Sequence, residues 1–333
     1  MRGSGRPTMV DVAADAGVSL KTVSRVINSE PNVDADMAAR VEASVVRLGY
    51  HRNAIAASLR SGSRDTIGFV SADLSNTFYM AIAAAVSAVA VTRGMQVIVA
   101  SSEEDAARER ALALDLAQRR VAGLIVVPAG DDSAYLSGEV ERGTPVVFLD
   151  RPGRGIRADD LLIDNRGGAR AAVAELLAVG HERIAVLLDS PAIYTMAERR
   201  AGVEEAFAAA GRAIDPRLVA EGLHTPAAAR EAMQRLLSLA EPPTAVFCGN
   251  NRSTIGALEA LLATEADVAL TGFDDFELSR LLPRAIRIVD YDTAALGERA
   301  ATTLLDRIAG SPPAGQPFLL PTHLVTRGLG LGG

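Results

Sequence analysis

The sequence predicts a small all-α unit with a short linking helix, followed by an α/β core of two doubly wound, parallel-sheet lobes. Up to Gly49, apolar residues recur at helical spacing. From Thr66 onward, short β-branched runs alternate with amphipathic helices, and this alternation occurs in two consecutive series. Apolar strands bounded by helices are typical of parallel sheets covered on both faces, so two series predict two lobes.

The composition fits a chain with two or three domains. The chain has 333 residues, of which 49% are apolar and 4% aromatic, and its net charge is −7. This charge is uneven, because residues 1–62 hold eight Lys and Arg against six Asp and Glu, a balance of +2, and the remainder holds −9. A mildly basic head on an acidic body indicates a DNA-binding end joined to a small-molecule domain.

Several classes of protein are disfavoured by the sequence. Cys248 is the only cysteine and lies in an apolar run, so we expect a buried thiol and no intrachain disulfide. The four histidines are scattered, and we predict neither a metal site nor a cofactor. The sequence shows no nucleophile–base pair that would indicate an enzyme. The first residues lack the apolar region of a signal peptide, and no apolar run reaches membrane-spanning length, which predicts a cytoplasmic protein.

The stretch Thr8 to Asn28 predicts two helices joined by a tight turn. Thr8 and Asp11 form a capping-box pair at the start of the first helix. Gly17 suits the left-handed turn at its end, and Ser19 suits the N-cap of the second helix. One face of the second helix is apolar, and the other carries Leu20, Lys21, Ser24, Arg25 and Asn28. This is the pattern of a DNA-reading helix-turn-helix, with an ordinary helical hairpin as the alternative. Capped by Asp34 and ended by Gly49, a third helix completes a small core.

The remaining elements are predicted from hydrophobic periodicity. The first series contains strands at Ile67–Val70, Gln96–Ala100, Leu124–Val127, Val146–Leu149 and Leu161–Ile163, with helices near Phe78–Arg93, Ala106–Arg120 and Ser133–Arg142. The second contains strands at Ile184–Leu188, Ala245–Cys248, Val268–Thr271 and Ile286–Val289, with helices at Thr195–Ala210, Ala227–Leu239 and Ser253–Leu262. A helix Ala294–Ala309 and a strand Leu324–Thr326 follow.

Polar residues collect just after these strands. They are Asp73 with Ser75 and Asn76, Asp150 with Arg151, Asp164 with Asn165, Asn250 with Asn251, and Asp274 with Asp275, and Arg199 lies in the helix after Ile184–Leu188. Strand ends converge in doubly wound folds, so these side chains can surround one ligand. Carboxylate, amide and guanidinium groups suit a polyhydroxyl ligand, whereas the alternative for each residue is a helix cap or a solvated loop.

The segments AGVSLKTVSRVIN and VEASVVRLGYHRNAIAASLRSG resemble the headpiece of the LacI family of bacterial transcription regulators, and the resemblance extends over nearly the whole chain. It implies a headpiece at 1–52, a hinge helix at 53–63 and a periplasmic-binding-protein-like core at 64–333. The core would comprise a first lobe at 64–162 plus 292–328 and a second lobe at 163–291. The helix and strand near the C-terminus would thus return to the first lobe.

Roles in DNA binding follow from residue chemistry and from this resemblance. Side-chain chemistry predicts base contacts from Leu20, Lys21 and Arg25. The resemblance implies phosphate contacts from Thr8, Ser19, Thr22, Asn28 and Tyr50. It also implies a minor-groove hinge with Asn53, Ala56 and the wedge residue Leu59, although a linker helix packed on the core is the alternative.

The strand-end positions and the resemblance together predict an effector site with Asp73, Phe78, Asp150, Arg151, Arg199, Asn250, Asp274 and Tyr291. Two positions depart from the family pattern. Asn251 replaces the usual Asp, and Tyr291 stands where Gln is common and offers a stacking face. Phe78 is equally suited to a hydrophobic core.

The predicted function is that of a homodimeric, cytoplasmic regulator of transcription, a repressor released from a near-palindromic operator by a sugar-like effector. The glycine-rich tail after Arg327 favours a dimer over a tetramer. The main alternative is a regulator whose ligand strengthens DNA binding, because the sequence does not fix the sign of the response. A transporter's solute-binding protein is a further alternative, which the headpiece disfavours.

Overall fold

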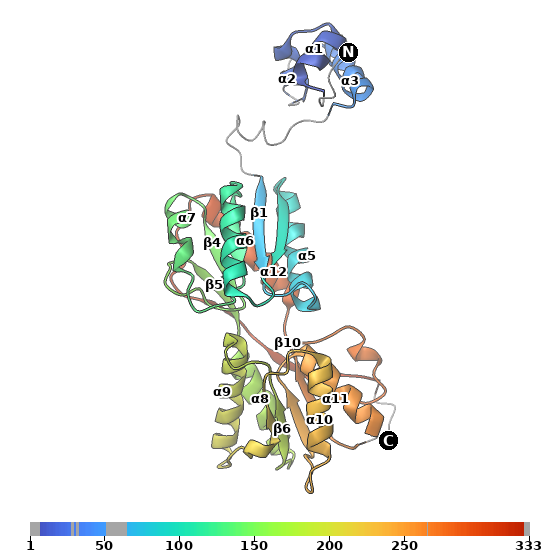
Figure 1. The fold of residues 1–333 in the computed structure, drawn as a ribbon, viewed down its shortest axis with the longest axis vertical. Coiled ribbons are helices and arrows are strands. Elements are labelled where there is room, and N and C mark those ends of the chain that lie inside the picture. The colour runs from blue at the N-terminus through green and yellow to red at the C-terminus, as the bar shows by residue number, and fades with distance from the viewer. Residues whose placement is uncertain (1–6, 28–29, 31–32, 51–64, 265, 330–333) are drawn as a thin grey trace. The chain divides into compact units, whose positions relative to one another are not determined.

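The computed structural model describes residues 7–27, 30, 33–50, 65–264 and 266–329. The chain divides into two compact units, Met1–Arg64 and Asp65–Gly333 (Figure 1). The predicted hinge at 53–63, with Asn53, Ala56 and Leu59, lies outside the described residues, as does Asn28.

The first unit has the predicted three helices, α1 (Met9–Ala16), α2 (Leu20–Ile27) and α3 (Ala35–Leu48). Thr8 and Asp11 form the expected capping box, and Gly17 ends α1 in the left-handed conformation with φ of 64°. The Ser19 hydroxyl accepts a hydrogen bond from the Thr22 amide at 3.1 Å, which caps α2. The three helices share a core centred on the fully buried Val12, Val23 and Val41. The helix-turn-helix prediction is confirmed for the described part of this unit.

The second unit contains two sheets, and each forms the centre of a lobe (Figure 1). The sheet of the first lobe is parallel and has the strand order β11-β5-β4-β3-β1-β2. Its strands are β1 (Thr66–Ser71), β2 (Gln96–Ser101), β3 (Gly123–Val126), β4 (Val146–Leu149), β5 (Asp159–Ile163) and β11 (Phe318–Leu320). Helices α5 (Thr77–Thr92) and α12 (Thr293–Ile308) pack together on one face, and α6 (Ala106–Gln118), η1 (Ala134–Leu136) and α7 (Ser137–Glu141) complete the lobe.

The sheet of the second lobe has the order β12-β10-β9-β8-β6-β7. Its strands are β6 (Ile184–Leu187), β7 (Val219–Ala220), β8 (Ala245–Cys248), β9 (Ala269–Phe273), β10 (Ile286–Asp290) and β12 (His323–Arg327). Helices α8 (Asn165–Ala178) and α9 (Tyr194–Ala209) pair with each other, as do α10 (Pro226–Leu237) and α11 (Asn251–Thr264). The 3-10 turns η2 (Pro216–Leu218) and η3 (Ser279–Leu281) lie in its loops. As predicted, Cys248 is fully buried, in the core beneath α10 and α11.

One predicted element belongs to the other lobe. Helix α12 packs on the first lobe as expected, but the strand predicted at Leu324–Thr326 does not. It is β12, which pairs antiparallel with β10 of the second lobe, so the prediction of residues 292–328 as part of the first lobe is wrong for β12, whereas α12 and β11 lie in the first lobe as predicted. The physical reason is that β12 covers the edge of β10, and Arg327 is held there by Asp275 and Asp290, both at 2.7 Å. Strands β7 and β11 were not predicted, because each is very short.

The chain therefore crosses between the lobes three times, after β5, after β10 and after β11. One apolar core extends from the α5–α12 face of the first sheet to the α8–α9 face of the second, and it contains Phe69, Phe247 and Phe273. The outer faces have cores of their own. This arrangement fixes the carboxyl ends of the strands in both lobes around a common region.

Gly17 and Gly49, which end α1 and α3, together test whether Arg40 stabilises the end of α1. Gly17 and Gly49 both have positive φ, 64° and 61°. A Cβ at Gly17 would lie 2.7 Å from Nη2 of Arg40, which donates to the carbonyls of Ala16 and Gly17, whereas a Cβ at Gly49 meets no atom within 4 Å. We expect Gly49→Ala to cost about 1 kcal/mol through backbone strain. Gly17→Ala should cost roughly 1 kcal/mol more, because the hydrogen bonds of Arg40 are also disrupted.

Hydrogen exchange of the α1 and α3 amides in the full-length protein measures both costs as changes in local unfolding free energy. Equal losses of protection in the two variants would contradict the role assigned to Arg40.

Candidate functional site

A cavity of about 60 Å³ lies at the carboxyl ends of the strands of both lobes. Seven of the eight predicted effector residues line it, namely Asp73, Phe78, Asp150, Arg151, Arg199, Asn250 and Asp274. They come from loops and helices that follow β1, β4, β6, β8 and β9, so the convergence expected from parallel strand ends is confirmed as geometry.

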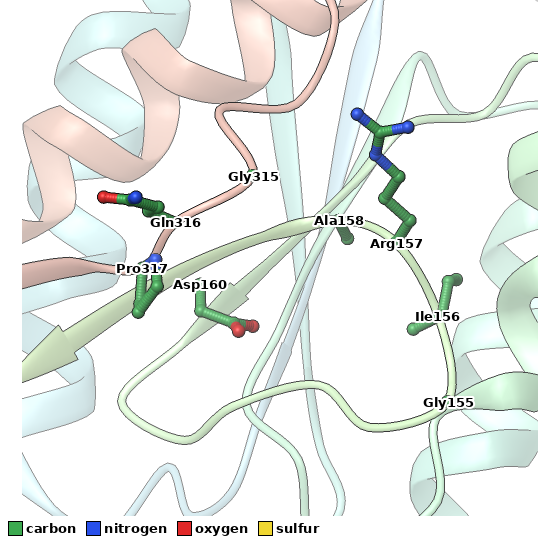
Figure 2. Close-up of a pocket in the computed structure, with 8 residues that line it drawn as sticks. All are labelled: Gly155, Ile156, Arg157, Ala158, Asp160, Gly315, Gln316 and Pro317. Atoms are coloured by element: carbon green, nitrogen blue, oxygen red, sulfur yellow. The ribbon is translucent and has the colours of Figure 1, made fainter.

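A larger cavity, of about 620 Å³, lies on the first lobe between Gly155–Asp160 and Gly315–Pro317 (Figure 2). Its charged side chains, Arg157 and Asp160, point in different directions (Figure 2). A binding site needs polar groups that converge on one point, so the smaller cavity is the better candidate.

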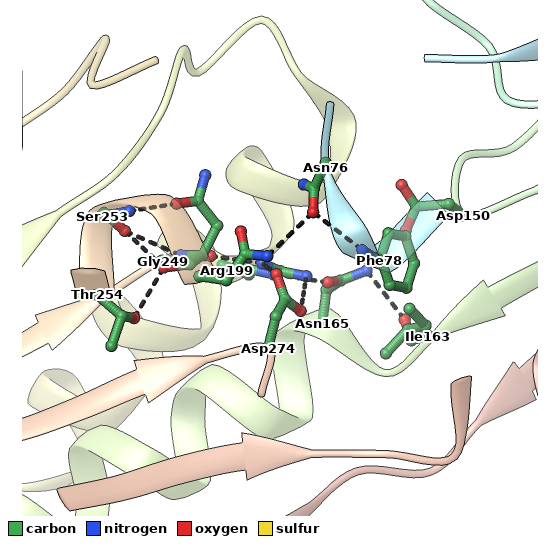
Figure 3. Close-up of polar contacts among 12 residues, drawn as sticks. Asn76, Phe78, Asp150, Ile163, Asn165, Arg199, Gly249, Ser253, Thr254 and Asp274 are labelled. Carbon is green, nitrogen blue, oxygen red and sulfur yellow. Dashed lines mark hydrogen bonds and ion pairs between the residues drawn. The ribbon is translucent and has the colours of Figure 1, made fainter. Parts of the chain in front are cut away.

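Arg199 is the centre of the second-lobe side of this cavity. Its guanidinium group donates to both carboxylate oxygens of Asp274, at 3.0 and 3.1 Å, and Nε donates to Oδ1 of Asn165 at 2.8 Å (Figure 3). Arg199 also lies 3.6 Å above the ring of Phe273, and only 3% of the residue is exposed. A buried guanidinium that is neutralised and hydrogen-bonded in this way is rigidly oriented.

Tyr291 also binds the carboxylate of Asp274. Its hydroxyl donates to Oδ1 of Asp274 at 2.6 Å, and burial raises the pKa of Tyr291 well above its usual value. The ring packs edge-on against Phe78 and at a tilt of 51° against Phe273, and Tyr291 does not line the cavity. In this structure Tyr291 orients Asp274 and packs against two aromatic rings, and the stacking on a ligand that the sequence suggests for it stays a prediction.

Asp150 and Arg151 form the first-lobe side. The Tyr79 hydroxyl donates to Oδ2 of Asp150 at 3.0 Å, and burial raises the pKa of the Asp150 carboxyl. Arg151 donates to both oxygens of Glu104 at 2.6 Å and to the carbonyl of Pro128 at 3.0 Å. Its Nε has no hydrogen-bond partner within the described ranges and lies 3.8 Å from Oδ2 of Asp150.

Asp150 and Asp274 occupy equivalent places in the two lobes. Each directly follows a central strand, each has positive φ, 66° and 68°, and each amide donates to a carbonyl of the neighbouring strand, in Leu161 and Val289. Left-handed conformations in residues other than glycine cost energy and are concentrated at functional sites. The backbone thus turns both carboxylates to the cavity at the end of their strands.

Side chains from opposite lobes also contact each other beside the cavity. Arg252 at the start of α11 forms an ion pair with Asp73 and donates to the Ser75 hydroxyl at 2.6 Å. Asn251 donates through Nδ2 to Oδ1 of Asn76 at 3.0 Å. Burial of Asp73 opposes its ionisation, but the hydrogen bonds from Ser75 and the Arg252 guanidinium outweigh it and lower the pKa of Asp73. These contacts hold the two lobes together in the described conformation.

The sequence interpretation missed several residues that line the cavity. They are Tyr79, Glu104, Asp189, Ile193, Thr195, Met196, His224 and Arg252. Glu104 and Asp189 follow β2 and β6, so the strand-end rule identifies them once it is applied to every strand. Nδ1 of His224 lies 2.9 Å from both oxygens of Asp189.

The residues predicted to contact DNA lie on or near α2. Leu20 and Lys21 are exposed at the start of the helix, and Arg25 forms an ion pair with Glu30 at 3.4 Å. Thr8 and Ser19 cap helices, Thr22 donates its amide to Ser19, and Tyr50 packs against the core of this unit. An apolar and basic outer face is therefore displayed on α2.

A helix-turn-helix unit joined to a two-lobed α/β core with a polar cleft defines a ligand-responsive, DNA-binding class of protein. Residues 8–53 match the family model of bacterial regulatory proteins of the lacI family, and residues 64–314 match that of periplasmic binding proteins and the sugar binding domain of the LacI family. The chain belongs to the LacI family, and it is a DNA-binding transcriptional regulator.

Individual relatives agree with this assignment. The HTH-type transcriptional regulator CelR of Thermobifida fusca is 32% identical over 334 residues, which cover 97% of this chain and 98% of CelR. GalR of Escherichia coli K12 is 31% identical over 90% of this chain and 88% of GalR.

Solved structures share the fold. The lac repressor dimer bound to operator and the anti-inducer ONPF superposes with a TM-score of 0.84 at 27% identity, covering 98% of this chain and 100% of that one. A CelR–cellobiose complex superposes with a TM-score of 0.69 at 31% identity, covering 96% and 98%. In the described ranges of the present chain, no helix has both the length and the apolar character to cross a membrane.

The Arg199–Asp274 pair yields a testable consequence for stability. Arg199→Met leaves a buried carboxylate unpaired and should lower the unfolding free energy of the core by about 3–5 kcal/mol. Adding Asp274→Asn to that variant should restore part of the loss, because the uncompensated charge is removed. Urea unfolding of the wild type, both single variants and the double variant measures the coupling. Strictly additive losses would refute it.

Proposed function

We propose that the protein is a homodimeric, cytoplasmic repressor that binds a near-palindromic operator and is released from it when a carbohydrate-like effector binds in the cleft between the lobes. The observation that carries the effector part is the convergence of buried and half-buried carboxylate, amide and guanidinium groups from both lobes on one cavity. In this proposal the protein binds its effector without transforming it and uses no cofactor.

The DNA-binding part is supported by the outer face of α2. Lys21 and Arg25 supply donors for guanine acceptors, and the exposed Leu20 supplies an apolar contact for a thymine methyl group. Thr8, Ser19, Thr22, Asn28 and Tyr50 are proposed to contact phosphates, and Asn53, Ala56 and Leu59 to contact the minor groove. One such unit is small, so specific affinity requires two units on a twofold site.

Dimer formation is supported by apolar side chains on one region of the first lobe. Met80 and Val91 on α5 and Ile98 and Val99 on the edge strand β2 are exposed, and α5 contacts β2. Exposed large apolar side chains on an edge strand and on the helix beside it are candidates for burial in a protein interface. The lac repressor structure with the same fold is a dimer.

Effector entry requires the lobes to part. A cavity of about 60 Å³ is well below the 300–1,000 Å³ or so that is usual for ligand sites. Opening breaks the Arg252–Asp73 and Asn251–Asn76 contacts, which the effector then replaces with contacts of its own. Occupancy therefore changes the angle between the lobes, and we propose that this change is transmitted to the DNA-binding units.

Selection from a random pool of duplex DNA at moderate salt tests the function. We expect enrichment of a twofold-symmetric sequence, bound at least about 10³-fold more tightly than random duplex. A pool without any symmetric consensus would overturn the proposal. Addition of effector to the selected complex then gives the sign of the response, and tighter binding would support the alternative in which the ligand acts as a corepressor.

Base readout by Arg25 is tested with a matched pair of variants. Arg25→Ala should weaken binding to the selected sequence by about tenfold or more and relax the preference at one base pair. The control is Arg47→Ala on α3, which also removes one positive charge from this unit. Arg47 forms an ion pair with Asp15. This variant should weaken specific and random duplex about equally. Fluorescence anisotropy titrations on both duplexes measure this, and identical discrimination in the two variants would exclude Arg25 from base readout.

A further inference from the structure

The guanidinium groups of the cleft are already neutralised by carboxylates of the same chain. Arg199 is paired with Asp274, Arg151 with Glu104, and Arg252 with Asp73. Two of these pairs are bidentate, with hydrogen bonds of 2.6 to 3.1 Å. An incoming anion would have to displace a carboxylate from each guanidinium that it uses, and so leave that carboxylate unpaired.

The carboxylates also outnumber the guanidinium groups. Among the described residues that line the cavity there are five carboxylates, Asp73, Glu104, Asp150, Asp189 and Asp274, and three guanidinium groups, so the formal charge is −2 with His224 neutral. With His224 neutral, the raised pKa of Asp150 does not change the sign, because four carboxylates remain against three guanidinium groups when Asp150 is protonated. A phosphate or carboxylate group on the ligand would meet an unfavourable field.

One place in the cavity is suited to a hydroxyl group. Nε of Arg151 is a buried donor without a partner in the described chain, and Oδ2 of Asp150, 3.8 Å away, is an acceptor. The two side chains are 7% and 5% exposed. A hydroxyl can accept from the first and donate to the second, whereas a phosphate oxygen can satisfy only the first and would be repelled by the second.

We propose that this cleft takes an uncharged polyhydroxyl ligand and discriminates against phosphorylated and carboxylated ones, with a ligand hydroxyl bridging Nε of Arg151 and Oδ2 of Asp150. This inference rests on the proposed function of the cleft as an effector site. The fold alone does not decide the matter, since structures that share it were solved with cellobiose and with fructose 1-phosphate.

Calorimetric titration of the full-length protein with matched sugars tests the inference. The probes are cellobiose and two matched pairs of sugars. The first pair is glucose and glucose 6-phosphate, and the second is fructose and fructose 1-phosphate. We expect an uncharged sugar to bind and phosphorylation to weaken binding by at least about tenfold. Equal or tighter binding of a phosphorylated sugar would overturn this inference and leave the effector site in place. Absence of binding by every probe would overturn the effector site and the inference together, and operator selection would still test DNA binding separately.

Two variants at adjacent positions separate the effect of charge in the cavity from the effect of the protein's overall charge. Glu104→Gln releases Arg151 from its carboxylate, and Glu103→Gln removes the same charge from an exposed ion pair with Arg108 at 2.8 Å. Glu103 does not line the cavity. We expect Glu104→Gln to reduce the preference for the uncharged over the phosphorylated sugar by at least about threefold, and Glu103→Gln to leave it unchanged. An unchanged preference in Glu104→Gln, with native circular dichroism, would overturn the charge argument.

Discussion

A charged group that is removed from water must be paired, and this constraint organises the region between the two lobes. Arg199 is almost fully buried, and its surroundings meet that requirement: Asp274 neutralises it, Asn165 and the Gly249 carbonyl each accept a further hydrogen bond, and Phe273 covers its face. Asp274 reaches the guanidinium only because its backbone adopts a left-handed turn at the end of β9. The same turn at Asp150 serves the first lobe.

The cleft is therefore lined by ion pairs that are already formed within the chain, at the place where the strand ends of the two sheets meet. The connections around it allow the lobes to move relative to each other. Three crossings and a shared apolar core keep the lobes together, whereas the direct polar contacts between them near the cavity are few and lie at its rim, at Arg252 and Asn251. A ligand that replaces these rim contacts shifts the equilibrium between lobe arrangements only by its differential affinity for them. This is the physical form that regulation takes in the proposed function.

Most of the fold and the centre of the site were predictable from sequence because both follow from local rules. Apolar strands alternating with helices define the lobes, and the residues after strand ends include Asp150, Asn250 and Asp274. What escaped prediction depends on contacts distant in sequence. Strand β12 joins the sheet whose edge is open, and nothing in its own residues specifies that edge. Arg252 is an ordinary first-turn helix residue until the other lobe places Asp73 beside it, and His224 follows a strand of two residues, too short to recognise.

In the proposed function, ligand binding in the cleft and binding of DNA are thermodynamically linked, so each must change the affinity for the other by the same factor. The affinity of the selected operator is measured with the cleft empty and saturated with the uncharged sugar that binds it, and the affinity of that sugar is measured with and without operator. We expect the same factor in both directions, of about fivefold or more. An operator affinity that does not change when the cleft is saturated would contradict this linkage.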